Sequence, residues 1–166
     1  AVGVSALEDL TEGIGNIAVG RYAAADIIDA DGNVAIGAYD GTVQPAMRLN
    51  TKSHDNVAIG AGALAAHNLT DNSEGGNVAV GYSAGLIVST GIQNTLIGGF
   101  AGDLITGGSQ NTLVGYNAGG ATTGNYNAFL GRSSGSAMTT GSKNTILGSY
   151  NGNQGGLDIR TSSNNI

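Results

Sequence analysis

The sequence predicts an all-β fold, a repetitive parallel β-roll or β-solenoid of about nine rungs. A short motif, asparagine followed by three mostly apolar residues and glycine, returns along the whole chain at intervals of 16 to 23 residues. Such a period is typical of stacked repeats, in which each unit buries its apolar face against its neighbours. The middle residues are mainly Val, Ile, Leu, Ala and Thr, a set rich in strand-forming side chains. Glycine every few residues would cost about 1 kcal/mol each inside a helix, which disfavours a helical repeat.

The motif asparagines and glycines are interpreted as structural. Asparagine tolerates left-handed backbone geometry at bends and can form hydrogen bonds from rung to rung, while glycine permits sharp bends with positive φ or the close approach of neighbouring chains. The chain starts and stops within a repeat, so we expect it to be a segment of a longer protein. The complete copies of the motif are Asn16–Gly20, Asn33–Gly37, Asn56–Gly60, Asn77–Gly81, Asn94–Gly98, Asn111–Gly115, Asn127–Gly131 and Asn144–Gly148.

The composition restricts the class of protein. Charged residues make up 11% of the 166 residues and apolar residues 40%, which argues against an intrinsically disordered chain. The 30 glycines do not occupy every third position, which excludes collagen. A net charge of −6 disfavours nucleic-acid binding, because phosphates would be repelled. No apolar run reaches the roughly 18 residues of a membrane span, and the absence of cysteine excludes disulfides and thiolate metal sites.

The middle of the motif is apolar on both sides of the predicted strand. Its third and fourth positions are apolar in every copy, as in Ala18/Val19 and Leu113/Val114. Adjacent strand residues point to opposite faces, and a strand that is apolar on both faces is normally buried on both. A coil of one repeat has only one interior. We therefore expect the second face to be covered by the same surface of a neighbouring chain, in an oligomer packed along the repeat axis.

Two motif positions exchange size halfway along the chain. In the first four copies the second residue is large and the third is Ala, whereas in the last four the second is small or polar and the third is large. Volume moves from one face to the other while its sum stays similar, as a packed core requires. We expect two sub-blocks, residues 1–85 and 86–155, with different filling of the coil interior and of the interchain core. Residues 156–166 are expected to lead toward a further C-terminal region.

The motifs resemble two related groups of proteins, the head repeats of trimeric autotransporter adhesins and, more closely, the repeat regions of bacteriophage tail fibres. The stretches Gly76–Gly85, Thr90–Gly98 and Thr122–Asn127 follow the tail-fibre pattern almost word for word, and Leu157–Ile166 is similar to the passage in which such fibres leave the repeats. The resemblance implies a homotrimer of parallel left-handed β-rolls. The long spacers at 38–55 and 61–76 depart from the compact unit and are decorations on a shaft or a binding surface.

The function implied is that of a non-enzymatic structural segment of a trimeric tail fibre, a rigid shaft that displays loops for attachment to a host surface. The expected location is the virion. The partners would be two further copies, fibre segments at both ends and a glycan or protein receptor on the host, with no cofactor, nucleic acid or membrane insertion. A head segment of a bacterial trimeric adhesin or another extracellular filament is the alternative. An ice-binding solenoid is remote, because a regular threonine row is absent from the first half.

Three groups of residues are candidates for chemistry or binding. Ser53-His54-Asp55 has the letters of a catalytic triad, but consecutive residues do not converge on one reacting atom. The acidic stretch Asp29–Asn33 has alternating oxygen ligands as calcium loops do, but lacks the downstream glutamate, so a plain acidic turn is favoured. Aromatic residues follow several motif glycines, and Tyr82 and Tyr116 are possible surface contacts for sugar rings, although packing under a neighbouring spacer is favoured.

Overall fold

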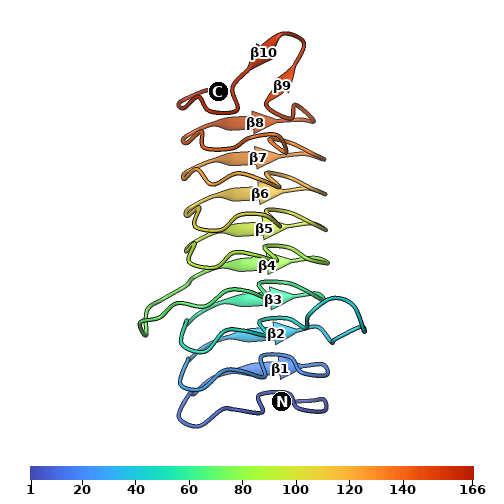
Figure 1. Ribbon diagram of the computed structural model, residues 1–166, viewed down its shortest axis with the longest axis vertical. Coiled ribbons are helices and arrows are strands. Elements are labelled where there is room, and N and C mark those ends of the chain that lie inside the picture. The colour runs from blue at the N-terminus through green and yellow to red at the C-terminus, as the bar shows by residue number, and fades with distance from the viewer.

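The computed structural model describes residues 1–166 and shows a parallel β-solenoid of about eight turns without helix (Figure 1). Eight three-residue strands lie one above another in chain order, so the predicted all-β parallel solenoid is confirmed. The ninth rung is represented at the N-terminal end by Val2, which forms a parallel bridge to Val19. The strands are β1 (Ile17–Val19), β2 (Val34–Ile36), β3 (Val57–Ile59), β4 (Val78–Val80), β5 (Thr95–Ile97), β6 (Thr112–Val114), β7 (Ala128–Leu130) and β8 (Thr145–Leu147).

Each strand consists of the three residues between the motif asparagine and the motif glycine. Equivalent positions of successive repeats lie side by side in every strand pair. The middle strand residue points into the coil and is buried in all eight strands, whereas its two neighbours point outward. The strands therefore form one wall of the coil, and the spacers between repeats form the other walls.

A ladder of asparagines runs along the interior of the stack and joins every rung to the next. The Oδ1 of each motif asparagine accepts a hydrogen bond from the backbone N–H of the next one, at 2.9–3.1 Å. Most side-chain Nδ2 groups also donate to the preceding Oδ1 and to a carbonyl across the turn, such as that of Gly108 for Asn94. None of these asparagines has a positive φ. The expectation that they set the bends through left-handed geometry is therefore wrong, because the residue before them, such as Gln93 or Gln110, has that geometry.

The motif glycines stand where successive rungs approach most closely. A Cβ added to Gly98 would lie 2.6 Å from the backbone C and O of Gly115, and one added to Gly115 would lie 2.4 Å from the carbonyl oxygen of Gly131. The φ of Gly98, Gly115 and Gly131 is between 129° and 139°, which residues with a side chain rarely adopt. The close approach is between rungs of one chain. At Gly98, Gly115 and Gly131 every side chain is therefore excluded, both by backbone conformation and by space.

The interior is filled in two ways along the stack. In β2 and β3 the inward residue is Ala, and a large side chain such as Met47 or Leu64 reaches it from the opposite wall. In β6 and β7 the inward residue is Leu113 or Phe129, and the opposite position is glycine. These opposite positions have a φ of 48–62° in both cases. In these four turns a large residue on one side therefore stands opposite a small residue on the other.

The C-terminal end of the stack carries a short hairpin. Strands β9 (Asn153–Gln154) and β10 (Leu157–Asp158) pair antiparallel above β8 (Figure 1). The chain then returns to the stack, where the backbone N–H and Nδ2 of Asn165 donate to Oδ1 of Asn144 at 3.0 and 2.7 Å. The end of the segment 156–166 thus adds one more asparagine to the ladder.

Replacing a central ladder residue should destabilise the whole stack. In Asn94→Ala the backbone N–H of Asn111 and the carbonyl of Gly108 lose a buried hydrogen-bond partner, and we expect a loss of about 3 kcal/mol in the free energy of unfolding. Urea unfolding followed by circular dichroism measures this loss. Asn153→Ala, at an exposed hairpin position, is the control. A change below about 0.5 kcal/mol in Asn94→Ala would contradict a stabilising role of the ladder.

The large and the small residue should be exchangeable between the strand and the opposite wall within one rung. A Cβ on Gly135 would meet the ring of Phe129, so Gly135→Leu alone should be destabilising. Gly135→Leu combined with Phe129→Ala places Ala on the strand and Leu on the opposite wall, as Ala58 and Leu64 do in the turn of β3. We expect a favourable coupling of about 2 kcal/mol in the double-mutant cycle. Gly135→Leu combined with the distant Leu96→Ala should be additive, and additivity of both pairs would refute the size exchange.

Candidate functional site

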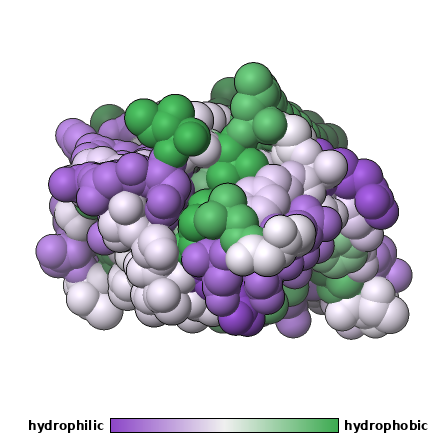
Figure 2. Space-filling model, turned by 90° about the horizontal axis from the view of Figure 1, so that it is seen from above, coloured by the Kyte–Doolittle hydropathy of each residue, from purple (hydrophilic) through white to green (hydrophobic).

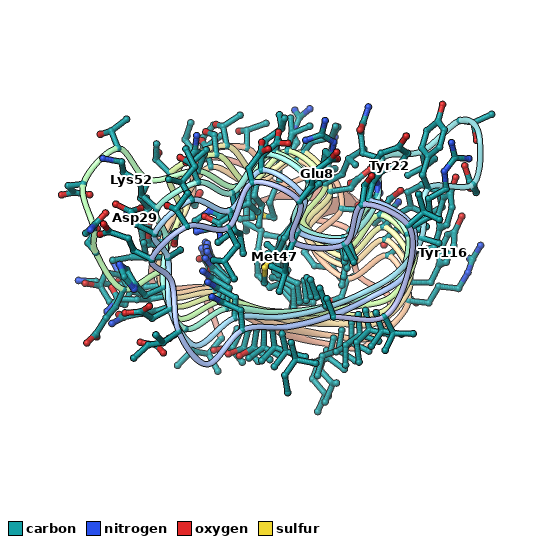
Figure 3. The ribbon with its side chains drawn as sticks, turned by 90° about the horizontal axis from the view of Figure 1, so that it is seen from below. Glu8, Tyr22, Asp29, Met47, Lys52 and Tyr116 are labelled. Carbon is teal, nitrogen blue, oxygen red and sulfur yellow. The ribbon has the colours of Figure 1, made fainter.

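The outer surface of the parallel sheet is an apolar face that nothing in the chain covers. We call it the apolar sheet face, and it consists of the first and third residues of β1–β8. Ile17 is 53% exposed, Leu130 50% and Leu147 80%. The side chains project from one long side of the cross-section (Figure 3). In the view onto the C-terminal end, hydrophobic residues follow the upper edge and reach into the middle of that end (Figure 2). No charged residue lies on these positions.

The relief of the apolar sheet face changes along the stack. In β1–β4 both outward residues of each strand are Val or Ile, whereas in β5–β8 the first is Thr or Ala. A hollow therefore lies over β6–β8, where Thr112, Ala128 and Thr145 stand beside Val114, Leu130 and Leu147. Thr95, Thr112 and Thr145 form no side-chain hydrogen bond within the chain.

Aromatic residues line the corner that follows the motif glycines. We call this set the aromatic corner, and it comprises Tyr22, Tyr39, Tyr82, Phe100 and Tyr116. Tyr82, Phe100 and Tyr116 stack edge to face along the axis, with ring centroids 5.4 and 5.7 Å apart. Tyr82 is 43% and Tyr116 51% exposed, so both combine packing against Phe100 with a free surface. Their role as contacts for sugar rings stays a prediction.

Arginines accompany the aromatic corner, a feature that the sequence analysis missed. The guanidinium carbon of Arg132 lies 5.7 Å from the ring centre of Tyr116. That of Arg21 lies 4.9 Å from Tyr22 and 5.9 Å from Tyr39, which is within the range of cation–π interactions. The position of these arginines could have been predicted, because each directly follows a motif glycine and so reaches the corner.

The two long spacers leave the stack in opposite directions. One bulges from the aromatic corner between β2 and β3, and the other from the opposite side of the coil between β3 and β4 (Figure 1). Parts of both return to the coil, since Met47, Asn50 and Leu64 are fully buried. Only the tips of the spacers 38–55 and 61–76 are therefore available as surface loops.

The residues Ser53, His54 and Asp55 do not form a triad. Ser53 Oγ lies 2.9 Å from Nε2 of His67, in the next spacer. His54 Nδ1 accepts a hydrogen bond from the backbone N–H of Asp31 at 3.0 Å. Ser53 and His67 are completely buried, so no substrate could reach them. Asn56 has no backbone carbonyl across the turn as its partner. Its Nδ2 donates instead to Ser53 Oγ and to the carbonyl oxygen of His54, and the Ser53–His67 pair fills the interior beside it.

Each carboxylate of the acidic stretch Asp29–Asn33 accepts a hydrogen bond within the protein. Oδ1 of Asp31 accepts a hydrogen bond from the backbone N–H of Ile14 at 2.6 Å, and Oδ2 of Asp29 accepts one from Asn72 at 3.4 Å. The structure contains no cluster of three or more His, Asp or Glu residues that could hold a metal ion. It also contains no helix long and apolar enough to cross a membrane.

No family model, no curated protein sequence and no solved structure matches this chain. Functional inference therefore depends on the repeats and on the geometry of the apolar sheet face and the aromatic corner.

His67 should make the stability of the stack depend on pH. Ser53 and Asn77 face Nε2, and Nδ1 has no hydrogen-bond partner. Burial lowers the pKa of His67 to about 4, an effect that the backbone of Ser89 and Val88 partly offsets. Because the unfolded chain takes up this proton near pH 6.5 and the folded chain only near 4, stability should fall by about 3 kcal/mol as the pH drops between these values.

The measurement is the free energy of unfolding of the protein and of His67→Gln across this pH range. The variant should lack this part of the pH dependence. His54→Gln should retain it, because His54 is outside the buried cluster. Identical pH profiles for all three proteins would show that His67 does not titrate as described.

Proposed function

We propose that this chain is a non-enzymatic structural segment of a trimeric fibre, a bacteriophage tail fibre or a similar virion appendage, and serves as a rigid shaft for host attachment. The observation that carries the proposal is the uncovered apolar sheet face, which runs through all eight strands. Parallel sheets are normally covered on both faces, and large apolar patches on soluble proteins mark interaction sites. A second surface of the same kind is the simplest cover.

The arrangement favours association of parallel copies side by side. The apolar sheet face is parallel to the axis of the stack, so copies packed through it would share one axis. The number of three copies comes from the resemblance of the repeats to tail-fibre and adhesin repeats. The outward threonines of β5, β6 and β8 would then lie at the interface, where their hydroxyl groups could form hydrogen bonds between chains.

The proposed mechanism is mechanical. Backbone hydrogen bonds and the asparagine ladder connect each rung to the next at about 4.8 Å, which makes a stiff rod without a large core. The two spacer tips project from the rod, and three copies would present each tip three times. Weak contacts with a host receptor would then combine through avidity.

A bacterial adhesin head is the alternative with the same assembly, located on the cell surface. The neighbouring segments of the intact protein distinguish the two: a coiled-coil stalk with a membrane anchor indicates the adhesin, and a chaperone or tip domain indicates the fibre. An ice-binding face has less support, because outward threonines occur only in β5, β6 and β8.

The mass of the protein in solution tests the proposal. We expect three times the chain mass of 16.3 kDa in light scattering coupled to size exclusion. Ile97→Lys combined with Val114→Lys should yield monomers, because charges on the apolar sheet face would be buried unpaired. Thr140→Lys, at an exposed turn away from the sheet, should leave the mass unchanged. A stable, soluble monomer of the unmodified chain would overturn the proposal.

A further inference from the structure

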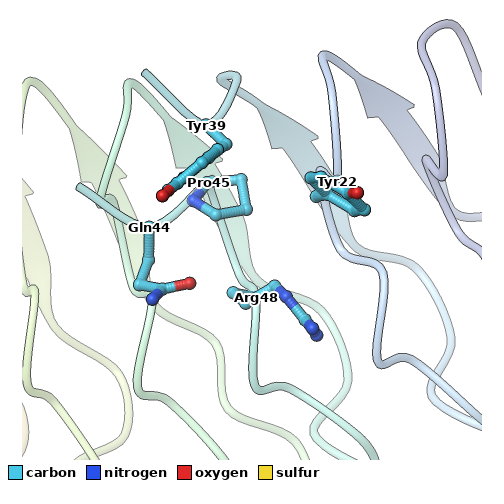
Figure 4. Close-up of a pocket in the computed structure, with 5 residues that line it drawn as sticks. All are labelled: Tyr22, Tyr39, Gln44, Pro45 and Arg48. Atoms are coloured by element: carbon cyan, nitrogen blue, oxygen red, sulfur yellow. The ribbon is translucent and has the colours of Figure 1, made fainter. Parts of the chain in front are cut away.

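A small pocket lies at the base of the loop that bulges from the aromatic corner. It has a volume of about 190 Å³ and is lined by Tyr22, Tyr39, Gln44, Pro45 and Arg48 (Figure 4). Tyr22 comes from the turn after β1, Tyr39 from the turn after β2, and the other three from the loop and its return. The two rings meet edge to face with centroids 6.5 Å apart. The pocket thus combines aromatic surface with amide, hydroxyl and guanidinium groups.

Two arginines lie at or beside this pocket, in a chain that is acidic overall. Arg21 and Arg48 are two of six basic residues in a protein of net charge −6. Arg48 forms an ion pair with Asp26, so its charge is balanced. Arg21 lies over Tyr22 and Tyr39 and has no carboxylate partner within the chain. One exposed cation is therefore left beside the aromatic rings.

The loop that closes the pocket is held in one conformation by its own hydrogen bonds. Oδ1 of Asp40 accepts hydrogen bonds from the backbone N–H groups of Thr42 and Val43, both at 2.8 Å, and from the Thr42 hydroxyl. These bonds hold the pKa of Asp40 below its usual value. The hydroxyl of Tyr39 donates to the carbonyl of Gly41 at 3.1 Å, and Pro45 is buried. An ordered pocket loses less entropy when it binds a ligand.

The pocket lies away from the apolar sheet face. In the view along the axis Tyr22 is on the wall opposite to the side from which the sheet side chains project (Figure 3). Copies that cover the apolar sheet face would therefore leave the pocket open. Association and ligand binding would use different sides of the coil.

We propose that this pocket binds one carboxylate-bearing sugar, a uronic or sialic acid residue of a surface glycan. The apolar face of a pyranose ring would pack on the tyrosines, Gln44 would exchange hydrogen bonds with its hydroxyl groups, and Arg21 would pair with the carboxylate. The volume is below the roughly 300 Å³ of sites for drug-sized ligands, which suits a single ring. The inference deepens the proposed role in host attachment and rests on it for its biological meaning, although binding itself does not require the trimer.

The test is ligand-observed NMR and calorimetric titration of the whole chain with glucuronate, N-acetylneuraminate and, as the neutral control, glucose. Glucuronate, with about 13 non-hydrogen atoms, gives a Kd of about 1 mM if it binds with ordinary efficiency. We expect this value for at least one of the two acids and at least tenfold weaker binding of glucose. Arg21→Gln should weaken the acid about tenfold and leave glucose unchanged, while Tyr39→Ala should abolish binding of both.

Tyr126→Ala, which changes an exposed tyrosine outside the pocket, is the matched control and should bind as the unmodified chain does. The absence of binding to both acids, or equal binding by Tyr39→Ala and Tyr126→Ala, would overturn the site. Circular dichroism of each variant shows that it has folded. The mass measurement decides the oligomer separately, so a trimer that binds no acid refutes only the pocket, and a monomer that binds one refutes only the trimer.

Discussion

The spacing between rungs is the constraint on which this structure depends. Strands paired in a sheet lie about 4.8 Å apart, and in this coil every wall must advance by the same distance per turn. Each position of the repeat therefore has the equivalent position of the next repeat directly above it. The same residue type can recur at one position of every repeat only if its copies fit directly above one another at that distance. Glycine does so because its backbone approaches the next glycine without a side chain, and asparagine does so because its amide both donates and accepts a hydrogen bond.

The same constraint explains why the coil has so few large residues inside. One turn encloses a narrow interior, in which the strand and the residue directly opposite it supply one large side chain between them in the turns of β3 and β7. Where the strand supplies Phe129, the opposite wall has Gly135, and where the strand supplies Ala58, the wall has Leu64. Hydrophobic burial within one chain is limited by this geometry. Regular hydrogen bonds along the stack and burial of the apolar sheet face between copies would supply the rest of the stability.

Much of the fold could be predicted from the sequence because stacking makes the pattern repeat. The spacing of asparagine and glycine located all eight strands, and the apolar middle of the motif indicated that both faces of the strands are apolar. What could not be predicted depends on contacts between spacers of different length. His67 meets Ser53 from another repeat, and Arg21 meets Tyr39 across a rung. Neither pair has a fixed offset in the repeat. The sequence analysis expected the motif asparagine to adopt the left-handed backbone conformation at each bend. The residue before the asparagine adopts it instead, and the asparagine side chain serves the ladder.

The spacers show how a repeat can change one side of the coil without changing another. A residue cannot be inserted into a strand freely, since the insertion would shift the register with both neighbouring rungs. A spacer is limited only at the points where it rejoins the walls, so residues can be inserted between those points at small cost. The loop at Asp40–Gln44 is such an insertion, and it sits on the corner where Tyr22 and Tyr39 already project. Recognition can therefore evolve on this corner while the sheet face keeps the regularity that association between copies would require.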